Sequence, residues 1–252
     1  MILAIETATS ACSAAVMAAD GALAAQRVDD KGQAQTQRLL PFVHAVLEEA
    51  GVSIGDLEAV VCGLGPGAYT GMRIGVATAR ALAQAAGLRL GGAPTLAAVA
   101  LALAPQVAPG APLVALLDGK RREVFAGVFR MDASVGADGS AGSADASPRA
   151  LHEVAPLAVV AADDLSGYLD RWPRALLGGD GAVLYADRLP TSVTVAPDVS
   201  RPTAAMVGRA WLAQVPGTVE GFEAVLPIYG RAPDAARWQG AAAPSDSSRG
   251  TR

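Results

Sequence analysis

The stretch Ile2-Leu3-Ala4-Ile5-Glu6, ILAIE, opens the chain with four apolar residues and ends at an acid. A second stretch of the same kind, Val114-Ala115-Leu116-Leu117-Asp118, VALLD, lies about midway along the chain. A short apolar run that ends at a polar residue is typical of a buried β-strand. We therefore interpret Ile2–Glu6 and Val114–Asp118 as equivalent first strands of two related halves.

The residues after Ile2–Glu6 predict a β-β-β-α-β-α order for the first half. Pro41 belongs in the first turn of a helix, so that helix is expected to begin near Arg38, and Gly51 ends it. The expected elements are strands at residues 2–6, 12–18, 22–28, 59–63 and near Leu88, and helices at about 38–50, 71–86 and from Thr95.

The second half repeats this plan with weaker signals. Its expected elements are strands at 114–118 and 123–130 and helices at 163–171 and 202–213. The repetition predicts an α/β protein with a duplicated actin-like (ASKHA, ribonuclease H-like) fold whose second half is degenerate. In that fold the two strand-end acids face each other across a cleft and manage a metal-bound nucleotide. We divide the chain into halves at 1–106 and 107–232, with a mobile loop at 132–147 and a disordered tail at 233–252.

Composition and charge limit the class of protein. The chain has 252 residues, 52% of them apolar, and a formal net charge of −4, which argues against a protein that grips nucleic acid unaided. Cys12 and Cys62 fall in expected strands, which indicates buried thiols in a reducing compartment, with a disulfide between them as the alternative. The chain has neither a signal-peptide pattern at its start nor an apolar run long enough for a membrane span. We therefore expect a cytoplasmic protein without membrane contact.

Residues 63–75, GLGPGAYTGMRIG, place five glycines between an expected strand and an expected helix. A Walker A phosphate loop requires a lysine after its last glycine, and no glycine in this stretch has one. The dinucleotide pattern fits Gly63, Gly65 and Ala68, but no acid follows before Asp118 to bind the ribose. An unspecific anion site at the start of the helix stays open. We favour helix packing, because Gly71, Gly75 and Ala79 form a row of small residues along one helix face.

Five segments, which follow one another along the chain in the same order as in the family, carry a family resemblance. The opening ILAIETATSACSAAV matches ILAIDTAT…CSVAL, and the glycine stretch matches GPGSFTGLRIG. QRLLPFVHAVLEEAG, LLDGKRREVFAGVF and LPIYGRAPDA match a helix, a DARRxEVYxA stretch and a closing PLYLRxPxA. Over residues 1–234 the chain therefore resembles the TsaB (YeaZ) family of bacterial tRNA threonylcarbamoyladenosine biosynthesis.

The resemblance implies a non-catalytic subunit of a tRNA-modifying complex. It implies a TsaD-type catalytic subunit and a TsaE-type P-loop ATPase as partners, and contact with tRNA through the complex. The complex would transfer threonylcarbamoyl to the adenosine beside the anticodon of tRNAs that read ANN codons. No cofactor is expected in this chain, whereas ATP and a metal are expected on the partner subunits. An exposed apolar helix pair would also allow a homodimer when the partner is missing.

The resemblance also implies a docking face on the helix after the third strand and the helix after the glycine stretch. The expected partner-interface residues are Leu39, Leu40, Val43, Tyr69, Met72, Arg73, Gly75, Val76, Ala79 and Arg80. Basic residues gather between Ala59 and Arg122. They form either a solvated surface or contacts from Arg73, Arg80, Lys120, Arg121 or Arg122 to an acidic partner or tRNA phosphate.

The chain departs from the family at the strand-end acid, which is Glu6 where the family usually has Asp. The longer side chain is expected to reach farther into the cleft, so we treat Glu6, Asp118, Gly65 and Gly67 as a vestigial nucleotide cleft. His44 and His152 do not form the His-x-x-x-His pair of the catalytic relative, and no metal site is expected. The alternative is an actin- or sugar-kinase-type enzyme that uses Glu6 and Asp118 around magnesium. A metallopeptidase is the least favoured reading.

Overall fold

The structure, a computed structural model, describes residues 1–29, 35–132 and 150–231. The first half forms β1 (Ile2–Glu6), β2 (Cys12–Met17), β3 (Leu23–Asp29), α1 (Gln35–Ala50), β4 (Ala59–Gly63), α2 (Tyr69–Ala86), β5 (Arg89–Ala93) and α3 (Thr95–Leu103). The rest forms β6 (Leu113–Asp118), β7 (Glu123–Met131), β8 (Leu151–Ala161), α4 (Leu165–Leu169), β9 (Leu176–Gly178), α5 (Asp180–Leu184), β10 (Thr194–Val195), α6 (Ala204–Leu212) and β11 (Val219–Glu220).

Two mixed sheets share one plan of strand pairing. In the first sheet, β1, β2 and β3 are antiparallel neighbours, and β4 and then β5 follow β1 in parallel. In the second sheet, β6, β7 and β8 are antiparallel, and β9 and then β10 follow β6 in parallel. Because β1 and β6 hold the same place, the duplicated α/β actin-like fold expected from ILAIE and VALLD is confirmed.

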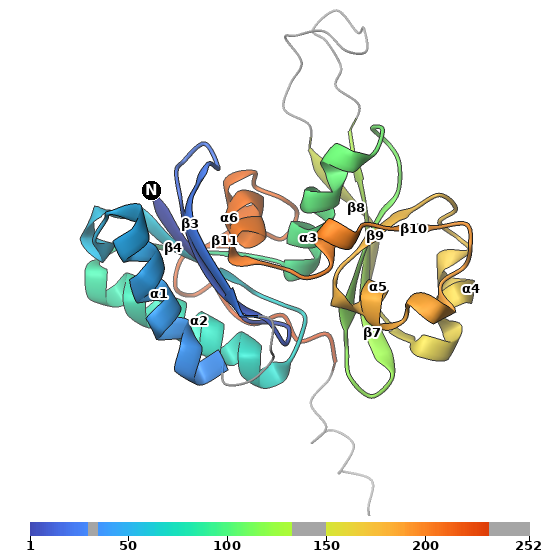
Figure 1. The fold of residues 1–252 in the computed structure, drawn as a ribbon, viewed down its shortest axis with the longest axis horizontal. Helices are drawn as coiled ribbons and strands as arrows, with labels where there is room; N and C mark the ends of the chain where they lie inside the picture. The colour runs from blue at the N-terminus through green and yellow to red at the C-terminus, as the bar shows by residue number, and fades with distance from the viewer. Residues whose placement is uncertain (30–34, 133–149, 232–252) are drawn as a thin grey trace, which may run out of the picture.

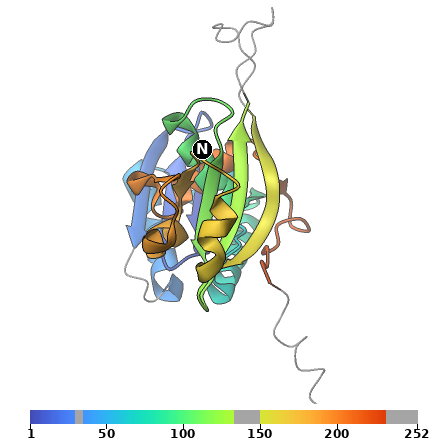
Figure 2. The ribbon, with the colours of Figure 1, turned by 90° about the vertical axis from the view of Figure 1, so that its right-hand side faces the viewer.

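Helices cover both faces of each sheet and bury three apolar cores. α1 and α2 cover the outer face of the first sheet, α3 and α6 lie between the sheets, and α4 and α5 cover the second sheet (Figure 1). Side chains alternate along β1, so that Leu3 and Ile5 pack under α1 and α2 while Ile2 and Ala4 face the central layer. Figure 2 views the second half from its side, with β7 and β8 as a long pair.

The last helix of each half packs against the other half's sheet. α3 contacts β6, β7 and β9, whereas α6 contacts β1, β2, β4 and β5. α6 can approach closely because Gly208 lies against Met17 and Ala4 of the first sheet. β11 also pairs with β5. The sequence-based division assigned residues 107–232 to the second half, but α6 and β11 complete the layers of the first sheet.

Most predicted elements of the first half are confirmed within two residues, and α1 is the exception. α1 begins at Gln35, about one turn before the expected start near Arg38, so Pro41 is its seventh residue. A proline there removes the N–H that would bond to the carbonyl four residues earlier. α2 ends as expected at Gly87, whose φ of 66° lies in the left-handed region. Cys12 and Cys62 are buried free thiols.

The second half is reduced in its helices but not in its sheet. It keeps five strands, whereas α4 and α5 have five residues each against sixteen in α1 and eighteen in α2. The predicted mobile loop at 132–147 lies, beyond Asp132, outside the described residues, as does the predicted tail at 233–252. In the described ranges, none of the helices is both long and apolar enough to cross a membrane.

Candidate functional site

The glycine stretch packs against the turn that follows β1. A Cβ at Gly67 would collide with the carbonyl oxygen of Ala8, and one at Gly75 would collide with Oγ1 of Thr7. The N–H of Ala68 donates to that Ala8 carbonyl at 2.6 Å, and Thr7 Oγ1 donates to the carbonyl of Gly71 at 2.8 Å. The row of small residues therefore lets the chain's own turn approach α2. At Gly71 and Gly75, the prediction that this row faces another helix is therefore wrong.

The predicted docking residues divide into a buried set and a surface set. The residues packed inside the chain are Leu39, Val43, Met72, Gly75, Val76 and Ala79. Leu40 and Tyr69 are 55% and 58% exposed, and Arg73 is also exposed. The six buried residues cannot form the solvent-facing part of a docking surface, which corrects the prediction. A partner role for the surface set stays a prediction.

Arg80 and Arg73 have contacts within the chain. Nη1 of Arg80 donates to the carbonyl of Phe222 and, at 3.3 Å, to that of Val225, and the guanidinium lies 5.7 Å from the Phe222 ring centre. Arg80 therefore holds the C-terminal segment against α2. Nη1 of Arg73 donates to the Tyr69 hydroxyl at 2.5 Å and stays at the surface.

Glu6, the acid at the end of β1, is fully buried. Its Oε1 accepts from the N–H of Ala8 at 2.5 Å, and its Oε2 accepts from Oγ1 of Thr95 at 2.8 Å. A Cβ at Gly63 would collide with this carboxyl group, so the glycine makes room for it. Burial raises the pKa of Glu6 from 4.5 to about 7, against the lowering effect of these hydrogen bonds. The expectation that Glu6 reaches into the cleft is wrong.

A cavity of about 300 Å³ lies where the two halves meet, at the ends of β1 and β6. Asp118 and Asp180 line it, and the N–H of Asp118 donates to Oδ1 of Asp180 at 3.0 Å. Burial, with a smaller contribution from the charge of Asp118, raises the pKa of Asp180. Asp180 was not predicted from the sequence, although it lies just after the apolar strand β9 and Gly179, much as Asp118 ends β6.

The four residues of the predicted nucleotide cleft do not share one cavity. Asp118 lines the cavity described above, Glu6 and Gly65 are buried, and Gly67 lines a different cavity. The physical reason is that the Glu6 carboxyl group satisfies its hydrogen bonds inside the first half. The prediction that these four residues form one cleft is therefore wrong.

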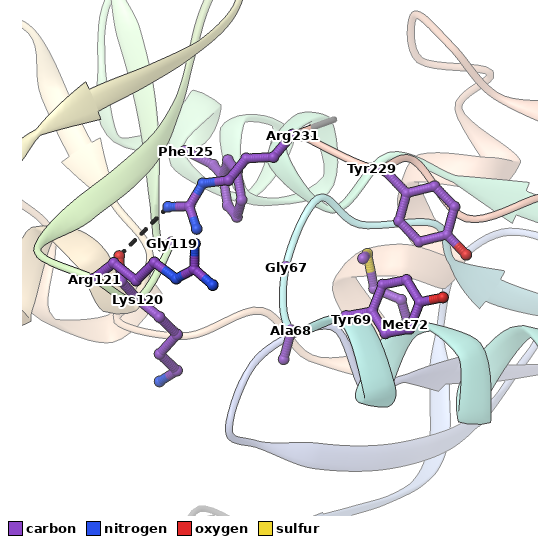
Figure 3. Close-up of a pocket in the computed structure, with 11 residues that line it drawn as sticks. Gly67, Ala68, Tyr69, Met72, Gly119, Lys120, Arg121, Phe125, Tyr229 and Arg231 are labelled. Atoms are coloured by element: carbon purple, nitrogen blue, oxygen red, sulfur yellow. Dashed lines mark hydrogen bonds between the residues drawn. The ribbon is translucent and has the colours of Figure 1, made fainter. Parts of the chain in front are cut away.

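The second cavity, of about 480 Å³, has a cationic side and an aromatic side (Figure 3). Lys120, Arg121 and Arg231 lie on one side, Tyr69 and Tyr229 lie on the other, and Gly67 and Ala68 run between them (Figure 3). The two tyrosine rings stack with their centres 5.3 Å apart. No pattern in the sequence indicates that the closing segment brings Tyr229 and Arg231 to the glycine stretch.

The histidines and cysteines are dispersed. His44 is exposed on α1, and His152 on β8 lies with Nε2 2.6 Å from Oδ2 of Asp132. Within residues 1–29, 35–132 and 150–231, no group of three or more His, Cys, Asp or Glu side chains is placed to hold a metal ion.

Comparison with known proteins places the chain in a family. The family model of tRNA N6-adenosine threonylcarbamoyltransferase (TsaD) matches residues 31–158, half of the chain. The tRNA threonylcarbamoyladenosine biosynthesis protein TsaB of Escherichia coli is 36% identical over 152 residues, 60% of this chain and 64% of that protein. YeaZ from Pseudomonas aeruginosa matches in structure with a TM-score of 0.67 and 27% identity, over 90% of this chain and 98% of that chain. The chain belongs to the TsaB (YeaZ) branch of the TsaD family.

A further TsaB relative extends the comparison. TsaB of Haemophilus influenzae is 31% identical over 124 residues, 49% of this chain and 51% of that protein. The matched regions span about a third to just under two thirds of the length of the first curated relatives. Sequence similarity to these two TsaB proteins therefore covers 49–60% of the chain, whereas the fold of YeaZ matches 90% of it.

Proposed function

We propose that this TsaB-family chain is a non-catalytic subunit of the complex that makes threonylcarbamoyladenosine in tRNA. The likeness to TsaB of Escherichia coli, whose name states this pathway, together with the YeaZ-like fold over 90% of the chain, carries the proposal. The substrates would be tRNAs that read ANN codons, and the protein would work in the cytoplasm.

A role without catalysis is supported by the strand-end acids. Glu6 bonds inward to Ala8 and Thr95, whereas Asp118 faces the cavity between the halves. Two acids that do not face a common space are poorly arranged to coordinate the metal ion of one bound nucleotide. His44 and His152 lie on different elements and do not form a metal-binding pair. We therefore propose that ATP and the metal bind to the partner subunits, a TsaD-type transferase and a TsaE-type ATPase.

We propose that the outer faces of α1 and α2 dock onto the TsaD-type partner. The exposed Leu40 on α1 would be part of this docking surface. An arginine in place of Val76 is unsuitable as a test, because Val76 is buried and a buried unpaired charge would unfold the chain. Leu40→Arg should instead abolish partner binding, measured by calorimetry, and leave the thermal midpoint unchanged. Leu184→Arg on α5 is the matched control, because Leu184 is also a leucine and is also 55% exposed. Equal affinities of the two variants would contradict this docking surface.

Reconstitution tests the function itself. The reaction combines TsaC, the enzyme that makes the threonylcarbamoyl intermediate, with TsaD, TsaE, tRNA, threonine, bicarbonate and ATP, with and without this chain. The modified adenosine is measured by mass spectrometry. Formation of the modified adenosine only when the chain is present supports the proposal. The same yield in its absence would refute the proposal.

The second candidate is a nucleotide-dependent enzyme of the actin or sugar-kinase type. The cavity lined by Asp118 and Asp180 favours it, because two carboxylates at one cavity are suited to magnesium. This candidate requires magnesium-dependent ATP binding by the isolated chain, which Asp180→Asn would weaken. Isothermal titration that detects no ATP binding would remove it.

A further inference from the structure

The turn between β6 and β7 has an unusual backbone. Lys120, Arg121 and Arg122 have φ angles of 59°, 54° and 60°, three consecutive residues in the left-handed region. Residues with a Cβ are strained in that region, and glycine or asparagine would be cheaper there. Strained backbone of this kind is concentrated at functional sites. The presence of three basic residues in a turn that disfavours them points to a use for their charge.

Two of these three residues, Lys120 and Arg121, line the cavity of about 480 Å³, whereas Arg122 pairs with Asp163. Among the residues that the structure describes, the lining of this cavity includes Lys120, Arg121 and Arg231 and no acidic side chain. Lys120 Nζ lies 2.6 Å from Oδ2 of Asp118, and Arg231 pairs with Glu123, so neighbouring acids outside the lining fix two of the cations in place. The site therefore presents oriented donors suited to phosphate oxygens.

The opposite side of the cavity offers a stacking surface. The rings of Tyr69 and Tyr229 are inclined by 30° with centres 5.3 Å apart, and the two residues are 58% and 47% exposed. Exposed tyrosine rings beside a cationic groove are the arrangement by which proteins hold single-stranded nucleic acid, with bases stacked on the rings and phosphates on the cations.

We propose that this cavity binds a single-stranded segment of RNA. Phosphates would lie against Lys120, Arg121 and Arg231, and a base would stack on the outer face of the tyrosine pair. The exposure of both rings favours a strand that continues past the site over a mononucleotide enclosed in a pocket. Because the chain has a formal net charge of −4, the attraction for RNA must come from this local cationic surface and not from the charge of the whole chain. The site rests on the proposed function only in that a tRNA-modifying complex needs surfaces that hold RNA.

The test uses the full chain and a fluorescein-labelled single-stranded RNA of about twelve nucleotides, followed by fluorescence anisotropy. Three phosphate contacts predict that the logarithm of affinity falls with the logarithm of salt concentration with a slope of about −2. Tyr229→Ala should weaken binding about tenfold through loss of stacking. Arg121→Gly should weaken binding and reduce the slope by about 0.7. Arg171→Ala is the matched control, because Arg171 lies over Tyr168 away from the cavity.

The outcomes separate this site from its alternatives. Binding that Tyr229→Ala and Arg121→Gly weaken and Arg171→Ala leaves unchanged supports the proposal. Equal affinity for a blunt RNA duplex, competition by AMP at the same concentration as the oligonucleotide, or equal affinity of all three variants would overturn it. The measurement needs no partner subunit, so its failure is distinct from a failure of the reconstitution that tests the proposed function.

Discussion

We expect Glu6→Gln to remove most of a pH-dependent loss of stability in the wild-type chain. Glutamine has the shape of the neutral acid, so its side-chain oxygen can still accept from the N–H of Ala8, and its amide can reach Oγ1 of Thr95. The substitution leaves the packing against Gly63 in place and removes only the ionisation of the buried group. The variant therefore isolates the free-energy cost of a charge at this position.

The magnitude follows from the two pKa values of Glu6. The ordinary value is 4.5, and burial raises the pKa in the folded chain to about 7. Between these values the folded chain keeps a proton that the unfolded chain has released. The stabilisation is therefore fully present below about pH 4.5 and is lost as the pH rises through about 7. Each pH unit in that interval is worth about 1.4 kcal/mol, so wild type should lose about 3 kcal/mol relative to the variant.

Urea denaturation followed by circular dichroism, at about pH 5 and about pH 8, measures this difference. Asp180, whose pKa is also raised, is present in both proteins, so its main effect cancels. Glu58→Gln is the control without this pH dependence, because a hydrogen bond from the N-terminal ammonium lowers the pKa of the exposed Glu58. Its contribution is lost only as the pH falls below about 4.5, outside the measured interval. A free-energy difference between wild type and Glu6→Gln that is the same at both pH values would refute the reasoning.

Three further substitutions test the packing around the glycine stretch and the basic turn. Arg121→Gly should raise the unfolding free energy by about 1 kcal/mol, because glycine adopts the left-handed region without strain, and an unchanged value would argue against that strain. Gly67→Ala should lower stability by about 1–3 kcal/mol through collision with Ala8, whereas Gly167→Ala, in open space on α4, should raise it slightly; equal effects would contradict the close approach. Arg80→Ala should release the C-terminal segment and lower stability by about 1–2 kcal/mol, with faster proteolysis near Phe222 as the second readout.

The strands that could be predicted are those whose run of apolar residues is enough to identify a buried strand. β1, β2 and β4 are buried along their whole length, and turn residues bound them. β8 was missed because it is an edge strand, mostly exposed, with Pro156 inside it. β10 and β11 have two residues each, too few for any periodicity. They form because β9 and β5 offer unpaired edges, which is a property of the folded sheet and not of a short segment.

The candidate sites were harder to predict, because tertiary packing decides which polar groups meet. Glu6 and Asp118 end equivalent strands, yet one turns inward to Thr95 and the other faces a cavity. The choice depends on Gly63, whose missing side chain leaves room for the Glu6 carboxyl group. Tyr229 meets Tyr69 only because the N–H of Ile228 donates to the carbonyl of Leu64 and brings the closing segment back to the glycine stretch.

The docking prediction failed in part for a general reason. A helical stripe of apolar and small residues identifies the face that is buried, but not what buries it. In α1 and α2 the chain's own sheet covers the stripe, since Leu39 and Val76 pack in the same core as Leu3 and Ile5. A partner must use residues rotated away from that stripe. Leu40 is one residue, and so about 100° around the helix, from the buried Leu39, and its exposed side chain is where a second helix can make contact.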